Sequence, residues 1–274
     1  MKKILIVTGL LSLVLCSCTN TFNQLSKTQD NDLKYEAAKQ YYAMGKFQKA
    51  SFLLDQTVAF NKGSESGQEN LYMLAMAEYG LGDYVTAAEY FRKYFTSYPK
   101  GIYTELAHYY YAHSLYMSTP EPRLDQTETV KAIKAYQEYL DVFPEAKYKD
   151  MSEREMFELQ DKLVYKEYLN AEMYYNLGGY FGNCTSGGNN YESCIITAQN
   201  ALKDYPFTPL REDFSLLIMK SKFYLAQQSV EEKKMDRFRD AEDECYGFIN
   251  EYPDSKHLIL AQKFIARCKK YIKD

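Results

Sequence analysis

Cysteine is the residue type whose spacing in this sequence most clearly predicts a chemical reaction. Cys18 follows the small residue Ser17 and lies three positions after the aliphatic Leu15, which is the pattern of a bacterial lipobox. Cleavage before Cys18 would free a cysteine that can carry several acyl chains, and several chains hold a protein on a membrane far more firmly than one. We therefore predict that Cys18 is lipidated. Cys16, which bulky Leu15 precedes, fits the pattern less well, and an ordinary cleaved signal is the alternative.

The residues before Cys18 have the features of a secretory signal. Lys2 and Lys3 supply a positive start, and the apolar run at residues 4–15 is too short to span a bilayer. We predict that residues 1–17 are a lipoprotein signal peptide. In some bacterial phyla an acidic cluster after the lipidated cysteine marks surface lipoproteins. The absence of such a cluster after Cys18 favours a periplasm-facing anchor.

The other cysteines leave alternatives open. Cys184 and Cys194 flank a short segment, and an oxidising compartment would let them form a disulfide. The alternative is that Cys194 fills a small-residue position between two helices. Cys245 and Cys268 are expected on adjacent helices as unpaired buried thiols.

The histidines and the charge do not fit an enzyme or a nucleic-acid-binding protein. His108, His113 and His257 lack the i, i+4 spacing that places two imidazoles on one metal. The formal net charge of −4 disfavours a nucleic-acid partner. We predict no catalytic residue, no metal and no cofactor apart from the N-terminal acyl or diacylglycerol anchor.

Three carboxylates lie close together at Glu153, Glu155 and Glu158. Paired carboxylates can serve as a general acid and base, but here they alternate with Arg154 and precede Lys162. Mixed charges of this kind on a helix are typical of a solvated face, which is the structure we predict for them.

A helical repeat positions all of these residues. Gly45 and Gly82 are 37 residues apart, and each is followed by a charged and then an aromatic residue. At the same offset Ala50 matches Ala87. A period near 37 is close to that of the tetratricopeptide repeat, in which a small residue lets two helices approach closely and glycine ends the first of them.

A second marker ends each hairpin. Four aromatic residues directly precede proline, and twelve residues before each proline stands a small residue. Proline cannot continue a helix, so these pairs predict where helices stop. The four pairs are Tyr98-Pro99, Phe143-Pro144, Tyr205-Pro206 and Tyr252-Pro253, and the four small residues are Ala87, Ala132, Cys194 and Ala241.

Together these signals predict an all-α chain, a tetratricopeptide-repeat superhelix of about five repeats and a C-terminal capping helix, with a concave side. Longer loops are expected at residues 118–127 and 178–190. The predicted order is a lipidated tether at 18–30 and a repeat domain at 31–274, with repeats at about 31–66, 67–101, 102–146, 151–208 and 209–254 and a capping helix at 255–273.

Tyrosines also follow the period. Tyr35, Tyr72 and Tyr109 are successive steps of 37, as are Tyr42, Tyr79 and Tyr116. Two members seven residues apart share one helix face. We predict that these six line a groove for a peptide partner, because tyrosine offers a rigid ring and a hydroxyl. Packing in the core is the alternative. We expect Tyr72→Ala and Tyr109→Ala to weaken binding and to leave the melting temperature nearly unchanged.

The lipobox at Cys18, the five helical pairs and the endings at residues 98–101 and 252–255 resemble the outer-membrane assembly lipoproteins called BamD or YfiO. The resemblance covers roughly residues 31–272. The first hairpin, which lacks an aromatic-Pro ending, and the Gly- and Asn-rich loop near Cys184 depart from it.

The resemblance implies a scaffold in the machinery that inserts β-barrel proteins into the outer membrane. The first repeats would bind unfolded outer-membrane protein precursors, and the last repeats would bind the BamA-like central barrel subunit. The protein would be lipid-anchored in the cell outer membrane and face the periplasm. The alternative is another repeat lipoprotein of the envelope, such as a pilotin-like or cell-division and peptidoglycan coordinator.

Overall fold

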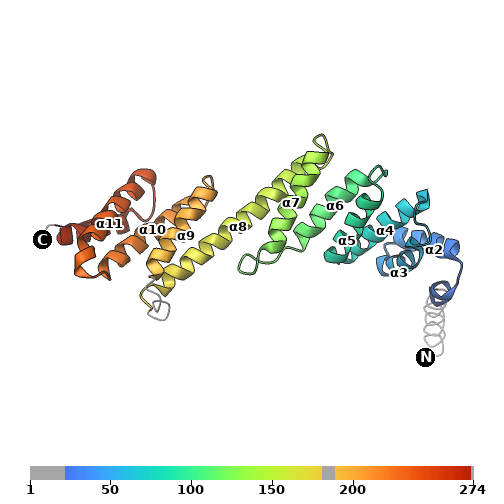
Figure 1. Ribbon diagram of the computed structural model, residues 1–274, viewed down its shortest axis with the longest axis horizontal. Coiled ribbons are helices and arrows are strands. Elements are labelled where there is room, and N and C mark those ends of the chain that lie inside the picture. Colours follow the sequence, from blue (N-terminus) through green and yellow to red (C-terminus); the bar gives the residue numbers. More distant parts are fainter. Residues whose placement is uncertain (1–21, 181–188, 273–274) are drawn as a thin grey trace, which may run out of the picture. The chain divides into compact units, whose positions relative to one another are not determined.

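The computed structural model describes residues 22–180 and 189–272, and helices dominate both stretches (Figure 1). A short helical segment at residues 22–27 precedes the repeats. The helices that follow are α2 Asn31–Ala43, α3 Phe47–Val58, α4 Glu65–Leu81, α5 Tyr84–Ser97, α6 Thr104–Met117, α7 Thr127–Val142, α8 Lys149–Leu177, α9 Asn190–Asp204, α10 Arg211–Gln227, α11 Glu231–Glu251 and α12 Leu258–Ile272. None of these helices is both long enough and apolar enough to cross a bilayer.

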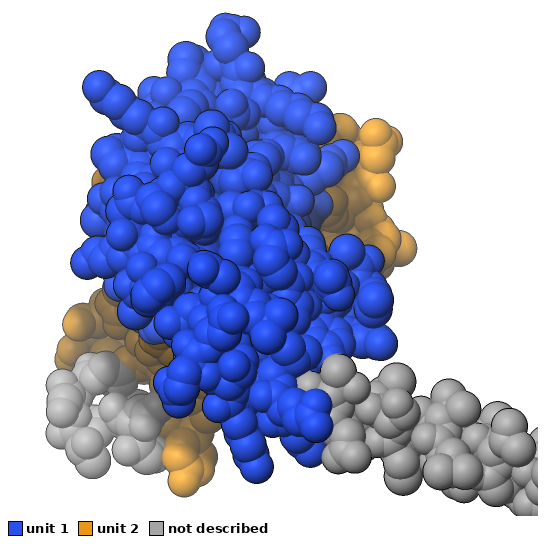
Figure 2. Space-filling view, turned by 90° about the vertical axis from the view of Figure 1, so that its right-hand side faces the viewer, with its two compact units in different colours: residues 1–120, 126–159 blue, residues 121–125, 160–274 orange. Residues whose placement is uncertain are grey.

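The chain forms two compact units, coloured blue and orange in Figure 2, and consecutive helices pack against each other within each unit. In unit 1, helices α2 to α7 contact their neighbours in chain order, and the start of α8, up to Leu159, belongs to the same unit. In unit 2, helices α9 to α12 do the same, and the rest of α8 joins them. This order confirms the predicted all-α fold of helical hairpins with a closing helix.

Glycine and proline end the helices where the sequence places them. Gly45 and Gly82 have positive φ angles of 68° and 79°, a region that residues with a Cβ avoid. Each glycine therefore lets the chain leave one helix and enter the next within a few residues. Asp83 then caps α5, because its carboxylate accepts a hydrogen bond from the backbone N–H of Thr86 at 3.1 Å.

The four aromatic residues before proline have nearly the same backbone geometry. Their φ angles lie between −130° and −125° and their ψ angles between 66° and 71°. Proline holds the preceding residue away from the helical region. Each residue consequently ends its helix, and the chain turns towards the next hairpin. The residues are Tyr98, Phe143, Tyr205 and Tyr252.

The predicted small residues lie where two helices touch. Ala87, Ala132, Cys194 and Ala241 are each 0% exposed. In unit 1, Ala87 packs with Phe91 of its own helix and with Leu71 of α4. The small side chain lets the backbones approach, and the large neighbour fills the space beside it.

In unit 2, Cys245 and Cys268 are free and buried, as the sequence predicts. Burial raises the pKa of the Cys245 thiol to about 12 and that of Cys268 to about 11. Only the thiolate reacts readily with alkylating agents.

We expect both thiols to resist iodoacetamide in the folded protein and to react fully in urea, as measured by mass spectrometry of their peptides. The matched control is Tyr246→Cys, which puts a thiol at a position 41% exposed and next to Cys245. Labelling of Cys245 as fast as that of the control would contradict this burial.

Candidate functional site

The six repeat-spaced tyrosines come from the first helix of each hairpin in unit 1. Helix α2 supplies Tyr35 and Tyr42, α4 supplies Tyr72 and Tyr79, and α6 supplies Tyr109 and Tyr116. On each helix the two residues are two turns apart. Because the spacing is the same on each helix, the six residues form two rows that differ in burial. Tyr35, Tyr72 and Tyr109 are the first row, and Tyr42, Tyr79 and Tyr116 are the second.

The tyrosines of the first row pack between neighbouring helices. Tyr35 is 7% exposed and Tyr109 is 3% exposed, whereas Tyr72 is half-buried. Tyr72 stacks on Tyr103 with ring centroids 4.4 Å apart, and Tyr109 stacks on Tyr148 at 4.2 Å. Both partners immediately precede a first helix, so the entry of the next hairpin covers the tyrosine before it. Tyr35 and Tyr109 are thus core residues, which is the alternative that the sequence left open.

The second row, Tyr42, Tyr79 and Tyr116, is half-buried, and the hydroxyls of Tyr79 and Tyr116 contact residues of the next hairpin. The Tyr79 hydroxyl lies 2.9 Å from His113 Nδ1. The Tyr116 hydroxyl donates to Glu158 Oε2 at 2.6 Å. Tyr42 packs edge-on against Phe47, with ring centroids 5.5 Å apart. These rings keep part of their surface in solvent while neighbouring residues hold their orientation.

A chain of polar side chains continues from Tyr79 through the unit. His113 Nε2 lies 3.3 Å from Glu155 Oε1, and the Tyr136 hydroxyl donates to Glu155 Oε2. Helices α4, α6, α7 and α8 are linked in this way. Glu155 is only 9% exposed, so the prediction of a solvated face is wrong for this residue. A carboxylate buried with two hydrogen-bond partners no longer needs water.

The surroundings favour the ionised carboxylate of Glu155 and the neutral phenols of Tyr79 and Tyr116. Burial by itself raises the pKa of Glu155, but the hydrogen bonds from His113 and Tyr136 outweigh it and leave the pKa below its ordinary value. Burial raises the pKa of Tyr79 to about 12, and the hydrogen bond to Glu158 does the same for Tyr116. The phenols therefore stay neutral near pH 7 and can donate hydrogen bonds.

Further tyrosines, which the repeat period does not predict, pack against the repeat-spaced ones. Tyr110 packs edge-on against Tyr79 with ring centroids 5.3 Å apart, and Tyr103 and Tyr148 stack on Tyr72 and Tyr109. Tyr103 and Tyr148 occupy equivalent places but are not 37 residues apart. The longer loop after α6 adds residues before Tyr148, so Tyr148 does not follow Tyr103 at the repeat spacing.

We call the half-buried members of the six repeat-spaced tyrosines, Tyr42, Tyr72, Tyr79 and Tyr116, the phenol face. It offers partly exposed ring surface on successive hairpins of unit 1, which suits an extended peptide better than a compact small molecule. Its role in binding stays a prediction.

Other predicted site residues fall elsewhere. Cys18 and Cys184 lie outside the described residues. Cys194 is buried between α9 and its neighbours, and burial raises the pKa of its thiol. A disulfide between Cys184 and Cys194 stays a prediction. Within residues 22–180 and 189–272, no group of three or more His, Cys, Asp or Glu side chains could hold a metal ion.

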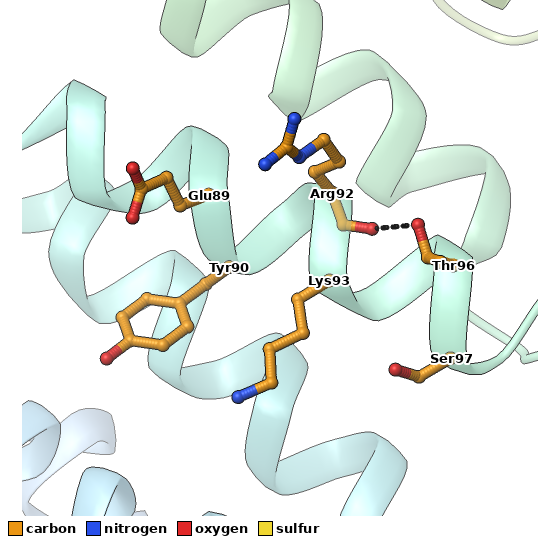
Figure 3. A pocket seen from close by; sticks show the side chains of 6 residues that line it. All are labelled: Glu89, Tyr90, Arg92, Lys93, Thr96 and Ser97. Atoms are coloured by element: carbon orange, nitrogen blue, oxygen red, sulfur yellow. Dashed lines mark hydrogen bonds between the residues drawn. The ribbon is translucent and has the colours of Figure 1, made fainter.

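A separate hollow lies on α5 and contains none of the six repeat-spaced tyrosines (Figure 3). It has a volume of about 730 Å³, and its lining includes Tyr90, Arg92 and Lys93. The Tyr90 hydroxyl donates to Asp55 on α3 at 3.1 Å. Because Tyr90 lies on α5, the second helix of its hairpin, it provides a control tyrosine outside the phenol face.

Repeated helical hairpins with a phenol-bearing row define a tetratricopeptide-type scaffold. A family model described as "YfiO: Outer membrane lipoprotein" matches residues 27–185. The chain belongs to this family.

Two solved structures with tetratricopeptide-like repeats resemble the chain weakly. Both are crystal structures of nearly identical repeats from a putative kinesin light chain of Podosopora anserina, and one of them carries a single substitution. The substituted form is 14% identical, covers 81% of this chain and 95% of its own, and has a TM-score of 0.31. The other is 13% identical, covers 83% and 100%, and has a TM-score of 0.32. No curated protein matches the chain.

Proposed function

We propose that this protein is a lipid-anchored, periplasm-facing scaffold subunit of the machinery that inserts β-barrel proteins into the outer membrane. It acts by binding other polypeptides and not by catalysis. The family match over residues 27–185 carries this proposal. The anchor is an acylated Cys18, and unfolded outer-membrane protein precursors bind the phenol face. The last repeats, α10 to α12, bind the central barrel subunit.

The second candidate is a different envelope adaptor with the same repeats. One observation favours it: the family match ends at residue 185 and does not reach α10 to α12. Those are the helices that the first candidate assigns to the barrel subunit. Helices α10 to α12 that differ from those of the family would be consistent with a binding partner other than the barrel subunit.

Affinity purification of the protein from detergent-solubilised membranes separates the two candidates. Co-isolation of a large outer-membrane β-barrel protein supports the first. Co-isolation of a secretin or a division protein without such a barrel would replace it with the second.

Binding at the phenol face has its own test. We expect Tyr42→Ala with Tyr72→Ala to weaken binding of a C-terminal peptide from an outer-membrane β-barrel protein by about 10-fold, since removal of an aromatic contact at an interface costs about 1 kcal/mol or more. Fluorescence anisotropy of a labelled peptide measures this. The matched control is Tyr90→Ala on α5, which removes a half-buried tyrosine from a second helix.

Equal peptide affinity in the double variant and the control would contradict binding at this face. Tyr109→Ala is unsuitable for the test. Its ring is buried and stacked on Tyr148, so the expectation of an unchanged melting temperature no longer applies to Tyr109.

A further inference from the structure

The first hairpin carries a mixed basic and aromatic patch beside its turn. Phe22 packs against Tyr41 and Phe52, with ring centroids 5.7 and 5.8 Å away. Lys49 Nζ lies 5.2 Å from the centre of the Phe22 ring and 5.5 Å from that of Tyr41. Lys46 Nζ lies 6.0 Å from the Tyr41 ring. Contacts of this kind hold the two ammonium groups next to aromatic surface.

Apolar side chains of the same patch point into solvent. Met44 is 63% exposed and Phe52 is 50% exposed. Met44, Lys46 and Lys49 share a hollow of about 240 Å³ with Tyr41 and Leu25. We call Phe22, Tyr41, Met44, Lys46, Lys49 and Phe52 the turn patch.

The charge of the turn patch differs from that of the chain. Residues 37–54 contain the three lysines Lys39, Lys46 and Lys49 and no Asp or Glu, although the whole chain has a formal net charge of −4. The ion pairs of this stretch use Lys39, which lies near Glu36 and Glu69. Lys46 and Lys49 contact aromatic rings instead, so their charge is available to an anionic partner.

The turn patch also lies close to the proposed anchor. Phe22 is the fourth residue after Cys18, and a fully extended chain spans at most about 14 Å over four residue steps. Phe22 is itself part of the patch. An acylated Cys18 therefore keeps Phe22 within about 14 Å of the membrane surface, and Tyr41, Lys49 and Phe52 pack directly against Phe22.

We infer that the turn patch binds the membrane surface, with Lys46 and Lys49 contacting anionic phospholipid headgroups and Met44 and Phe52 entering the interface. This inference rests on the anchor at Cys18 that the proposed function includes. Basic and apolar side chains on one surface are the combination that interfacial membrane binding uses. The contact gives the first hairpin a defined orientation on the bilayer.

A tryptophan reporter tests the inference, because the chain has no Trp. The full acylated protein with Met44→Trp is reconstituted into vesicles of phosphatidylcholine alone or with phosphatidylglycerol. The matched control is Phe60→Trp just beyond the far end of α3, where the native residue is 64% exposed. We expect a blue shift and quenching by brominated lipid only for Met44→Trp and only in vesicles with phosphatidylglycerol.

Charge reversal supplies the second arm. Lys46→Glu with Lys49→Glu in the Met44→Trp protein should abolish the blue shift. Lys62→Glu with Lys100→Glu changes the net charge equally at exposed positions elsewhere and should leave it in place. If Met44→Trp perturbs the circular dichroism spectrum, Phe52→Trp serves as the reporter.

The outcomes separate this inference from the proposed function. Intact-mass measurement of the mature protein reports whether Cys18 is acylated, and an unmodified N-terminus would overturn the anchor itself. An acylated protein whose tryptophan does not respond to phosphatidylglycerol would overturn the turn patch alone. A blue shift with an acidic peptide but not with vesicles would also overturn it, in favour of a protein partner.

Discussion

Replacing Glu155 with alanine should lower the free energy of unfolding of unit 1 by about 3 kcal/mol, which is the size expected when a buried charged pair loses one partner. The variant leaves the Tyr136 hydroxyl buried without its acceptor and removes the carboxylate from His113. Because the network joins α4, α6, α7 and α8, the loss should reach several hairpins. Urea unfolding followed by circular dichroism measures the change, and hydrogen exchange assigns it to unit 1.

The control lies on the same helix. Glu158 also accepts a hydrogen bond from a tyrosine, but it is exposed. We expect Glu158→Ala to change the stability by less than about 1 kcal/mol. Tyr136→Phe should cost less in the Glu155→Ala background than in the wild type, since the hydroxyl then has no partner to lose. Equal losses for Glu155→Ala and Glu158→Ala would refute the network.

The contribution of Glu155 should depend on pH. Its folded pKa lies below the ordinary value of 4.5 because hydrogen bonds from His113 and Tyr136, together with the charges of His113 and Arg154, exceed the opposing effect of burial. A depressed pKa stabilises the fold above pH 4.5, and this part is lost as the pH falls through the folded pKa. The stability difference between wild type and Glu155→Ala should therefore keep its full value above about pH 4.5 and shrink as the pH falls below it.

In unit 2 we expect Phe223→Ala to cost about 3–5 kcal/mol, the range for a buried aromatic residue cut to alanine. Phe223 is 0% exposed and joins three helices. It stacks on Phe264 of α12 with ring centroids 4.0 Å apart, and it meets Phe238 of α11 edge-on at 6.1 Å. A cavity at this position would loosen the contact of α10 with both neighbours.

Phe207→Ala is the matched control in the same unit, because its ring is 97% exposed. We expect its stability to stay within about 0.5 kcal/mol of the wild type. Phe223→Leu, which refills most of the space, should fall between the two alanine variants. The midpoint of urea unfolding ranks the three, and a Phe223→Ala midpoint equal to that of Phe207→Ala would rule out this packing.

The sequence by itself determined where the helices end and which residues let them touch. Proline restricts the residue before it, and glycine alone reaches a positive φ without strain, so Tyr98 and Gly82 end their helices whatever surrounds them. Ala87 and Ala132 were predictable for a similar reason, because any close helix pair needs a small residue. These are local rules, and they suffice for the fold.

Only the tertiary structure decided which repeat-spaced tyrosines are buried. Tyr72 and Tyr109 have the same register and the same stacking geometry, yet Tyr109 is buried and Tyr72 keeps part of its surface in solvent. Likewise, Glu155 and Glu158 are one turn apart on α8, and only Glu155 meets a histidine from α6. The burial of a residue depends on which side chains of the next hairpin cover it. Loops of unequal length change those covering side chains, although the residue and its own helix stay the same.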